Sequence, residues 1–307
     1  MKKILYIGVL ALLYNSTIAQ EHLTASNAFK NHEAYYNLEK AFAEKESVYH
    51  LNLRQQNLTR LDQRIGTLKH LQFVNCMKND IDSLPESMGD LKELQIITLK
   101  QNKISYLPER FGEMKAIREL SLEKNQLSAL PESFGQLKKM TSLDLSVNKL
   151  EVLPTSFSNL KSLINLDLDN NQLSVFPESI TKCKKLETLD LSNNKFSIIP
   201  ASTSKLKKLN RLSLNNCSIE QLELNFSKLK HLKTLDLTSN NLIELPSNIG
   251  ELENLEILML SFNQLKSLPE SISQLKKLTT LTLLGNNWTE EEKTKIQSLL
   301  PNVDIRF

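Results

Sequence analysis

A 23-residue period constrains this chain more than any other feature of its sequence. From Val48 onward the chain follows the pattern L-x-x-L-x-L-x-x-N-x-L-x-x-L-P-x-x-F/I-G/S-x-L-K-x without insertion or deletion. One such unit cannot cover its own leucines, so the repetition predicts an elongated array of stacked units with one continuous core. The eleven units start at Val48, Leu71, Leu94, Ile117, Met140, Leu163, Leu186, Leu209, Leu232, Leu255 and Leu278.

The L-x-L stretch of each unit predicts a short β-strand. In Leu143-Asp144-Leu145 the alternation places the two leucines on one face and the aspartate on the other. Stacking brings equivalent strands side by side in the same direction, so we expect a parallel sheet along the array. The Leu-Pro pair that follows favours extended segments and short 3-10 turns over long helices on the opposite side.

The ninth position of each unit is predicted to hold the turn after the strand. A buried amide side chain can donate and accept hydrogen bonds at once, so it satisfies backbone groups that the turn leaves inside the core. Cys217 stands at this position in the eighth unit, and Gln56 stands there in the first. The predicted ladder consists of Asn79, Asn102, Asn125, Asn148, Asn171, Asn194, Cys217, Asn240, Asn263 and Asn286.

The three cysteines are interpreted as buried apolar residues. Cys76 and Cys183 stand at core positions of the pattern, and Cys217 stands in the ladder. An odd, scattered set of this kind is not typical of a disulfide framework or a metal site. Two irregularities are expected on the outer side, because Glu223 replaces the proline of the eighth unit and Thr203 replaces the Phe or Ile of the seventh.

The sequence outside the array predicts export and two capping segments. Residues 1–19 combine Lys2 and Lys3, an apolar run and a small-residue ending at Ala19, which is the pattern of a cleavable signal peptide. We expect no membrane span, because the apolar run is shorter than the ~20 residues that a bilayer requires. The mature chain would be secreted, periplasmic or attached to the cell surface.

Arrays of this kind need ends that cover the outermost leucines. Within residues 20–47 the stretch from Glu33 to Glu46 is expected to form an N-terminal capping helix, with Tyr35, Leu38, Ala41 and Phe42 on one face. The array itself spans residues 48–288. In residues 289–307 we expect a helix that starts at Thr289, followed by a short strand, as the C-terminal cap.

By these motifs the chain resembles the leucine-rich-repeat proteins of the 23-residue, L-P-containing kind, over residues 48–307. The spacing is similar to that of Ras-interacting and plant Ras-group members, whereas the signal peptide and helical lead-in resemble exported bacterial members. The resemblance implies an α/β horseshoe solenoid with a parallel sheet on its concave face. It also implies that this face binds another protein or an extended ligand.

Two groups of residues are candidates for partner binding on the strand side. Outward-pointing carboxylates gather in the middle of the array, and apolar side chains gather near its end, as at the cores of many interfaces. The aspartates alternatively serve only as soluble strand residues, and the apolar side chains as scattered exposure. The candidates are Asp144, Asp167, Asp169, Asp190 and Asp236 in the first group, and Ile257, Met259, Phe262 and Leu284 in the second.

Composition narrows the function classes. The formal net charge is +3 before signal cleavage, so no strong overall field favours nucleic acid. No catalytic, phosphate-binding or metal-binding motif appears, and no cofactor is expected. We therefore predict a non-enzymatic, monomeric scaffold that binds a protein or peptide. Two alternatives stay open, namely an adhesion or glycan-recognition element and, if the N-terminus is not cleaved, a cytosolic Ras-type signalling scaffold.

Overall fold

The computed structural model describes residues 33–307. The signal peptide predicted for residues 1–19, and its cleavage site, lie outside the described residues.

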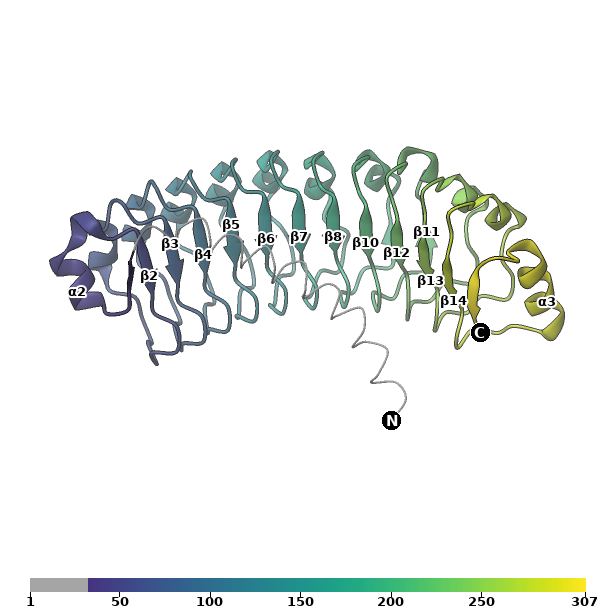
Figure 1. Ribbon diagram of the computed structural model, residues 1–307, viewed down its shortest axis with the longest axis horizontal. Helices are drawn as coiled ribbons and strands as arrows, with labels where there is room; N and C mark the ends of the chain where they lie inside the picture. Colours follow the sequence, from purple (N-terminus) through teal and green to yellow (C-terminus); the bar gives the residue numbers. More distant parts are fainter. Residues whose placement is uncertain (1–32) are drawn as a thin grey trace.

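A parallel sheet of thirteen strands runs the length of the molecule. Eleven of its strands begin 23 residues apart, and Figure 1 shows them side by side along one open, curved solenoid. The strand and turn spacing predicted from the L-x-L motif is confirmed. The strands are β1 (Ala34–Tyr35), β2 (His50–Asn52), β3 (Phe73–Asn75), β4 (Ile96–Thr98), β5 (Glu119–Ser121), β6 (Ser142–Asp144), β7 (Asn165–Asp167), β8 (Thr188–Asp190), β10 (Arg211–Ser213), β12 (Thr234–Asp236), β13 (Ile257–Met259), β14 (Thr280–Thr282) and β15 (Asp304–Arg306).

The register of the sheet places equivalent positions of successive units opposite each other. Leu143 pairs with Leu166, and Asp144 pairs with Asp167. The central residue of each strand that follows the 23-residue spacing is Leu, Val or Ile and is buried in the core. The residue after it belongs to the face that points away from the core, here called the strand face. Any residue type that recurs at one position therefore forms a row across the sheet.

Short 3-10 helices build the opposite side of the solenoid. Most begin after the proline of the Leu-Pro pair, which serves as the N-cap without a side-chain hydrogen bond. Under them the buried rings of Phe111, Phe134 and Phe157 stack in parallel, 6.3 and 6.4 Å apart. These helices are η1 (Lys45–Ser47), η2 (Gln63–Thr67), η3 (Glu86–Asp90), η4 (Glu109–Glu113), η5 (Glu132–Gln136), η6 (Thr155–Asn159), η7 (Glu178–Lys182), η8 (Ala201–Lys205), η9 (Phe226–Lys228), η10 (Ser247–Glu251) and η11 (Glu270–Gln274).

The irregularity predicted for the seventh and eighth units is present. Helix η9 has three residues instead of five, and Asn225 caps it in place of a proline. Beside it, β9 (Ile198–Ile199) and β11 (Gln221–Leu222) form a separate two-stranded parallel sheet. Thr203 is fully buried, and its hydroxyl oxygen has no hydrogen-bond partner among the described residues.

The N-terminal cap differs from the prediction. The helix expected from Glu33 to Glu46 covers only α2 (Leu38–Ala43), with Asn37 as its N-cap. Tyr35 lies in β1 instead, because this segment extends the parallel sheet by pairing with β2. The sheet edge is thus closed by a strand, and the short helix covers the end of the core with Ala41 buried.

The C-terminal cap has the expected order of elements. Helix α3 (Glu290–Leu299) starts after Thr289, whose side chain accepts a hydrogen bond from the Glu292 N–H. Strand β15 then pairs with β14 and closes the other end of the sheet. Trp288 packs against Phe307 with its ring edge-on and donates its Nε1 hydrogen to the Leu283 carbonyl at 2.8 Å.

A left-handed backbone conformation recurs at the eighth position of every unit. The φ values there lie between +52° and +70°, and only the last of these residues is glycine. Val147 and Phe262 adopt this conformation at a steric cost, since such φ values are outliers for β-branched or bulky side chains. The sequence gives little sign of this feature, because Gln, Lys, Val, Asn, Ser, Phe and Gly all occupy the position. The residues are Gln55, Lys78, Gln101, Lys124, Val147, Asn170, Asn193, Asn216, Ser239, Phe262 and Gly285.

Candidate protein-binding surface

The ladder asparagines hold the turns beneath the strand face. Asn102 shows the arrangement: its amide donates to the carbonyls of Cys76 and Leu99 at 2.9 and 2.8 Å, and its Oδ1 accepts from the Ile81 N–H at 3.1 Å. Each such side chain therefore joins two units through three buried hydrogen bonds. The same pattern is made by Asn79, Asn125, Asn148, Asn171, Asn194, Asn240, Asn263 and Asn286.

The two units without a ladder asparagine turn differently. The thiol of Cys217 reaches the Leu191 carbonyl at 3.1 Å, but sulfur cannot reproduce the full set of amide hydrogen bonds. In these units the tenth residue, Asn57 or Ser218, also takes a positive φ. The asparagine thus fixes the path of the chain as well as the stability of the turn.

The aspartates of the strand face form one row. Register places Asp144, Asp167 and Asp190 opposite one another on β6, β7 and β8, and Ser213 separates Asp190 from Asp236 on β12. The fifth predicted residue, Asp169, lies two residues after Asp167. The structure therefore brings the predicted carboxylates together.

These aspartates also have a structural role that sequence analysis missed. Asp190 Oδ1 accepts a hydrogen bond from the Ser192 N–H at 2.9 Å, and Asp236 accepts the equivalent bond from Thr238. Asn52 and Asn75 make the same contact in the first two units. Asp or Asn at the fifth position thus stabilises the corner where the strand ends, as in an Asx-turn. The sequence could have indicated this role, because Asp and Asn both occur at the fifth position and both carry an oxygen that accepts this hydrogen bond.

Burial keeps the middle of the row in an unfavourable environment for charge. It raises the pKa of Asp190 to about 6, and the neighbouring charges of Asp169 and Asp236 raise it further, against the hydrogen bonds from Ser192. Burial likewise raises the pKa of Asp236 and of Asp169. Among the ion pairs of residues 33–307 none involves Asp144, Asp169, Asp190 or Asp236. These four carboxylates are therefore held without an ion pair, although the positive charge of Arg211 partly offsets the rise in the pKa of Asp236.

Of the four apolar residues predicted near the end of the array, only some are accessible to solvent. Phe262 is 44% exposed, and Ile257 and Leu284 are half-buried. Met259 is 6% exposed, so the expectation that it is an exposed anchor is wrong. It stands at a fifth position, opposite Asp236 and Thr282 on the neighbouring strands. The ring of Phe262 lies over Gly285, where a Cβ atom would be 2.5 Å from the ring, and the Phe262 N–H donates to the Leu284 carbonyl at 2.6 Å.

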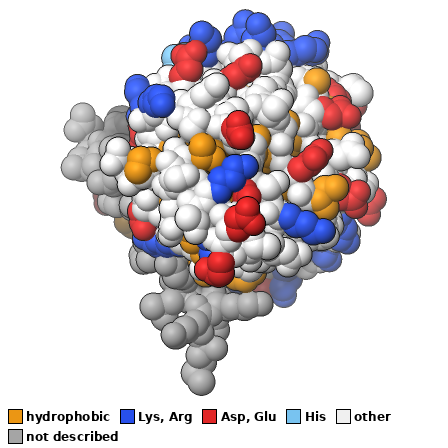
Figure 2. Space-filling view, turned by 90° about the vertical axis from the view of Figure 1, so that its right-hand side faces the viewer, with side chains coloured by type: hydrophobic (Ala, Val, Ile, Leu, Met, Phe, Trp, Pro, Cys, Tyr) orange, Lys and Arg blue, Asp and Glu red, His pale blue; other side chains and the backbone are white. Residues whose placement is uncertain are grey.

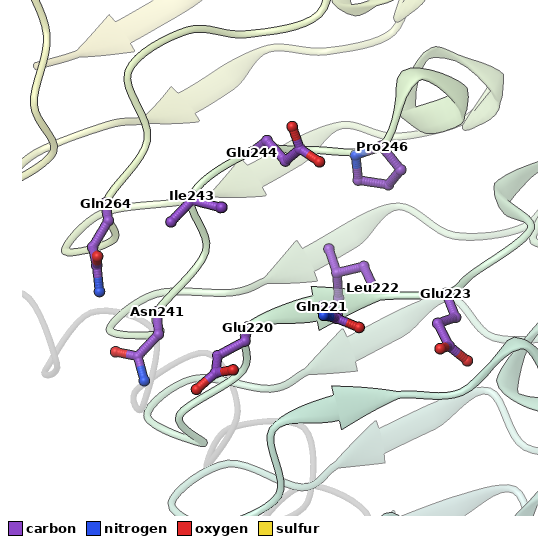
Figure 3. Close-up of a pocket in the computed structure, with 9 residues that line it drawn as sticks. All are labelled: Glu220, Gln221, Leu222, Glu223, Asn241, Ile243, Glu244, Pro246 and Gln264. Carbon is purple, nitrogen blue, oxygen red and sulfur yellow. The ribbon is translucent and has the colours of Figure 1, made fainter.

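A pocket of about 640 Å³ lies beside β11, between the irregular eighth unit and the units that follow it. Figure 3 shows the carboxylates of Glu220 and Glu223 at the two ends of this strand, with Glu244 on the next unit. Leu222, Ile243 and Pro246 supply its apolar lining. The irregular units thus carry a hollow that no sequence motif predicted.

Other kinds of site find little support in the described part of the chain. Cys76, Cys183 and Cys217 are free and buried, and burial raises their thiol pKa values to about 12, 11 and 12. Residues 33–307 contain no group of three or more His, Cys, Asp or Glu side chains placed to hold a metal ion. No helix within these residues has the length and apolarity that a membrane crossing needs.

Comparison with protein families agrees with this geometry. A model described as "Leucine-rich repeat region" matches residues 46–126 and 212–300, which is more than half of the chain, and two further leucine-rich-repeat models match residues 115–173 and 161–204. The chain belongs to the leucine-rich-repeat proteins. No curated protein sequence matches this leucine-rich-repeat chain significantly.

Solved structures include similar solenoids. A leucine-rich-repeat protein of Leptospira interrogans is 28% identical, with coverage of 90% of this chain and 100% of that one and a TM-score of 0.51. A TDR receptor is 26% identical over 90% of this chain and 50% of its own, with a TM-score of 0.77. The functional domain of InlJ from Listeria monocytogenes is 28% identical over 76% of this chain and 50% of its own, with a TM-score of 0.64. The leucine-rich-repeat chain thus spans about half of the latter two.

Proposed function

We propose that this chain is a non-enzymatic, exported scaffold that binds a protein partner on its strand face. An extended segment of the partner lies across the strands. Its basic side chains meet the aspartate row, and an apolar side chain contacts Phe262 and Leu284. The export component rests on the signal-peptide pattern of residues 1–19.

The observation that carries the proposal is the row of carboxylates that the register aligns on β6, β7, β8 and β12. Asp169, Asp190 and Asp236 are ionised less readily than exposed aspartates because the sheet takes them out of water. A Lys or Arg side chain placed between them would replace the lost hydration and relieve the repulsion along the row. The fold tolerates these charges through the turn hydrogen bonds, and a cationic partner would stabilise them.

The apolar end gives the partner segment a second contact. Two large hydrophobic side chains are exposed in the ninth to eleventh units, Ile243 and Phe262. Phe262 is the aromatic one, and it lies in the turn that follows strand β13. Aromatic anchors beside charged contacts are common at the centres of protein interfaces. The family supports a binding role, since the similar TDR protein is described as a receptor.

The proposal is tested by selecting peptides from a random display library against the mature chain from Gln20. We expect the selected peptides to contain Lys or Arg together with an apolar or aromatic residue. Their affinity should fall at least tenfold in a variant carrying Asp144→Asn, Asp190→Asn and Asp236→Asn. Asparagine keeps the turn hydrogen bond, as Asn52 and Asn75 show, so this variant should remain folded.

A matched control removes three carboxylates elsewhere. Glu151→Gln, Glu187→Gln and Glu244→Gln change the net charge equally but lie outside the row. All three residues are exposed, and Glu244 lines the pocket beside β11. The control should bind the selected peptides with unchanged affinity. Selection of peptides without basic residues, or equal binding by both variants, would contradict the proposed function.

A further inference from the structure

A second charged surface lies on the edge of the solenoid where the 3-10 helices lead into the strands. Figure 2 shows Lys and Arg side chains gathered at the upper edge, on which the short helices lie in Figure 1. Six of the exposed lysines there belong to the sixth and seventh units. We call this set the lysine edge, and it consists of Lys182, Lys184, Lys185, Lys205, Lys207 and Lys208.

The twentieth position of the units explains why this stretch is charged. In the second and third units it is Asp90 and Glu113, which pair with Lys69, Lys92 and Arg110. In the sixth and seventh units it is Lys182 and Lys205. The same edge is therefore neutralised in the early units and positively charged in the middle ones.

The contacts of Lys184 show the consequence. Its Nζ donates to the carbonyls of Thr181 and Lys205 at 2.5 and 3.2 Å, which holds it against the backbone of the next unit. Burial lowers its pKa, and so do the positive charges of Lys205, Lys182 and Lys161. No residue of the lysine edge forms an ion pair within residues 33–307.

In the eighth unit Lys228 again occupies the twentieth position, but two lysines that follow it are compensated. Lys230 lies 3.8 Å from Glu253, and Lys233 lies 3.0 Å from Glu256. Adjacent parallel strands are ~4.8 Å apart, so the unpaired cations form a compact block that repeats with the units. A linear chain of closely spaced anions matches such a block better than a single anion does.

The side chains between the lysines narrow the class of anion. The intervening Cys183 and Leu206 are buried, and none of the large hydrophobic side chains exposed in residues 33–307 lies on this edge. Insertion into a lipid surface requires apolar side chains, and single-stranded nucleic acid binds through stacked aromatic rings. We propose that the lysine edge binds an acidic polysaccharide, a linear polymer of sulfated or carboxylated sugars, through ionic contacts. This surface is separate from the strand face and independent of the function proposed for it.

The test compares binding of size-defined heparin to two charge-reversal variants at 50 mM NaCl. Lys182→Glu with Lys205→Glu restores the acidic twentieth position of the second and third units, so the substitutions have a native precedent in this fold. Lys149→Glu with Lys195→Glu is the matched control. It changes the net charge by the same amount at the tenth position, where an acidic residue also has a precedent, namely Asp80 of the second unit. We expect the first variant to weaken heparin binding at least tenfold and the second to change it less than threefold.

Three outcomes would overturn the inference. The wild-type chain could fail to bind heparin above its binding of neutral dextran. Both variants could lose binding equally, which would indicate net charge alone. Vesicles with phosphatidylglycerol or a single-stranded oligonucleotide could bind more tightly than heparin and lose binding in the first variant, which would assign the edge to another class of partner. Circular dichroism spectra equal to that of the wild type establish that both variants are folded.

Discussion

Lys92 and Lys184 occupy the same position of the template and make the same backbone contacts, yet their surroundings are opposite. Lys92 donates to the Gly89 carbonyl and forms an ion pair with Glu113 at 2.9 Å. Lys184 donates to the Thr181 carbonyl and faces Lys205. In the early units charges pair across neighbouring units and serve the fold. In the middle units like charges are aligned, on the strand face as aspartates and on the edge as lysines, and this alignment is the basis of the two binding surfaces proposed above.

The largest expected effect concerns the ladder, which is continuous from the second unit to the seventh and interrupted at Cys217 in the eighth. Asn102→Ala leaves the buried Ile81 N–H without a partner and removes one of the two amide donors from each of the Cys76 and Leu99 carbonyls. We expect a loss of about 2–4 kcal/mol in the free energy of unfolding, measured by urea denaturation. Cys217→Ala should cost about 1 kcal/mol, since one weak thiol hydrogen bond and a small volume are lost. Equal losses would contradict the role assigned to the amide.

The stability contributions of Glu113 in the early units and of Asp190 in the middle units should change with pH in opposite directions. Arg110 and Lys92 lower the pKa of Glu113 to about 2, so this contribution to stability is present at neutral pH and is lost as the pH falls toward 2. Burial raises the pKa of Asp190 to about 6, so the native state binds the proton more tightly than the unfolded state. The wild type should therefore gain stability as the pH falls from 7 to 5.

Asp190→Asn tests the pH dependence of stability that is assigned to Asp190. The variant should lose this pH dependence, with a change of about 1 kcal/mol relative to the wild type between pH 5 and pH 7. Thermal unfolding at the two pH values measures it. An identical pH dependence in wild type and variant would show that Asp190 is hydrated in the folded protein.

Thr203 gives the next smaller effect. Thr203→Val removes a buried hydroxyl that has no partner, so we expect the free energy of unfolding to rise by about 1 kcal/mol. Ser204→Ala is the matched control. Its hydroxyl accepts a hydrogen bond from the Asn225 N–H at 2.8 Å, and its removal should lower stability by a similar amount. A destabilised Thr203→Val variant would indicate that the hydroxyl has a partner.

The smallest effect is that of the exposed charges themselves. Lys205→Glu places a carboxylate next to Lys184, as Glu113 lies next to Lys92. We expect the melting temperature to rise by no more than about 1 °C at low salt and to show no difference at 1 M NaCl, because exposed ion pairs contribute little and are screened. A lower melting temperature would mean that the two positions are not equivalent.

Much of the fold could be predicted from the sequence because the pattern is local and repeated. Leucine spacing gave the strands, and the Leu-Pro pair indicated the short helices. The N-terminal cap was predicted less well, since Tyr35 fits a helical face in sequence but pairs with β2 in space. The left-handed eighth position was missed because its requirement lies in the backbone and many side chains occupy it.

The alignment of the candidate aspartates was predicted from the sequence, whereas their role in binding stays a prediction. Register fixed the aspartate row once the strands were known. The burial of Met259 and the turn hydrogen bonds of Asp190 could not be predicted, because both depend on how closely neighbouring strands approach. The change from acidic to basic residues at the twentieth position was visible in the sequence. Only the contacts of Lys92 and Lys184 show that this residue lies beside the lysine of the preceding unit.

The most direct test of the account is the affinity of one selected basic peptide for the wild-type chain at pH 5 and pH 7. A cation on the strand face favours the ionised form of Asp190, so binding should be several-fold tighter at pH 7. The variant with Asp190→Asn and Asp236→Asn should bind more weakly at pH 7 and show little pH dependence. Equal affinity at both pH values, or wild-type affinity in the variant, would contradict the claim that the aligned carboxylates of the middle units serve a partner.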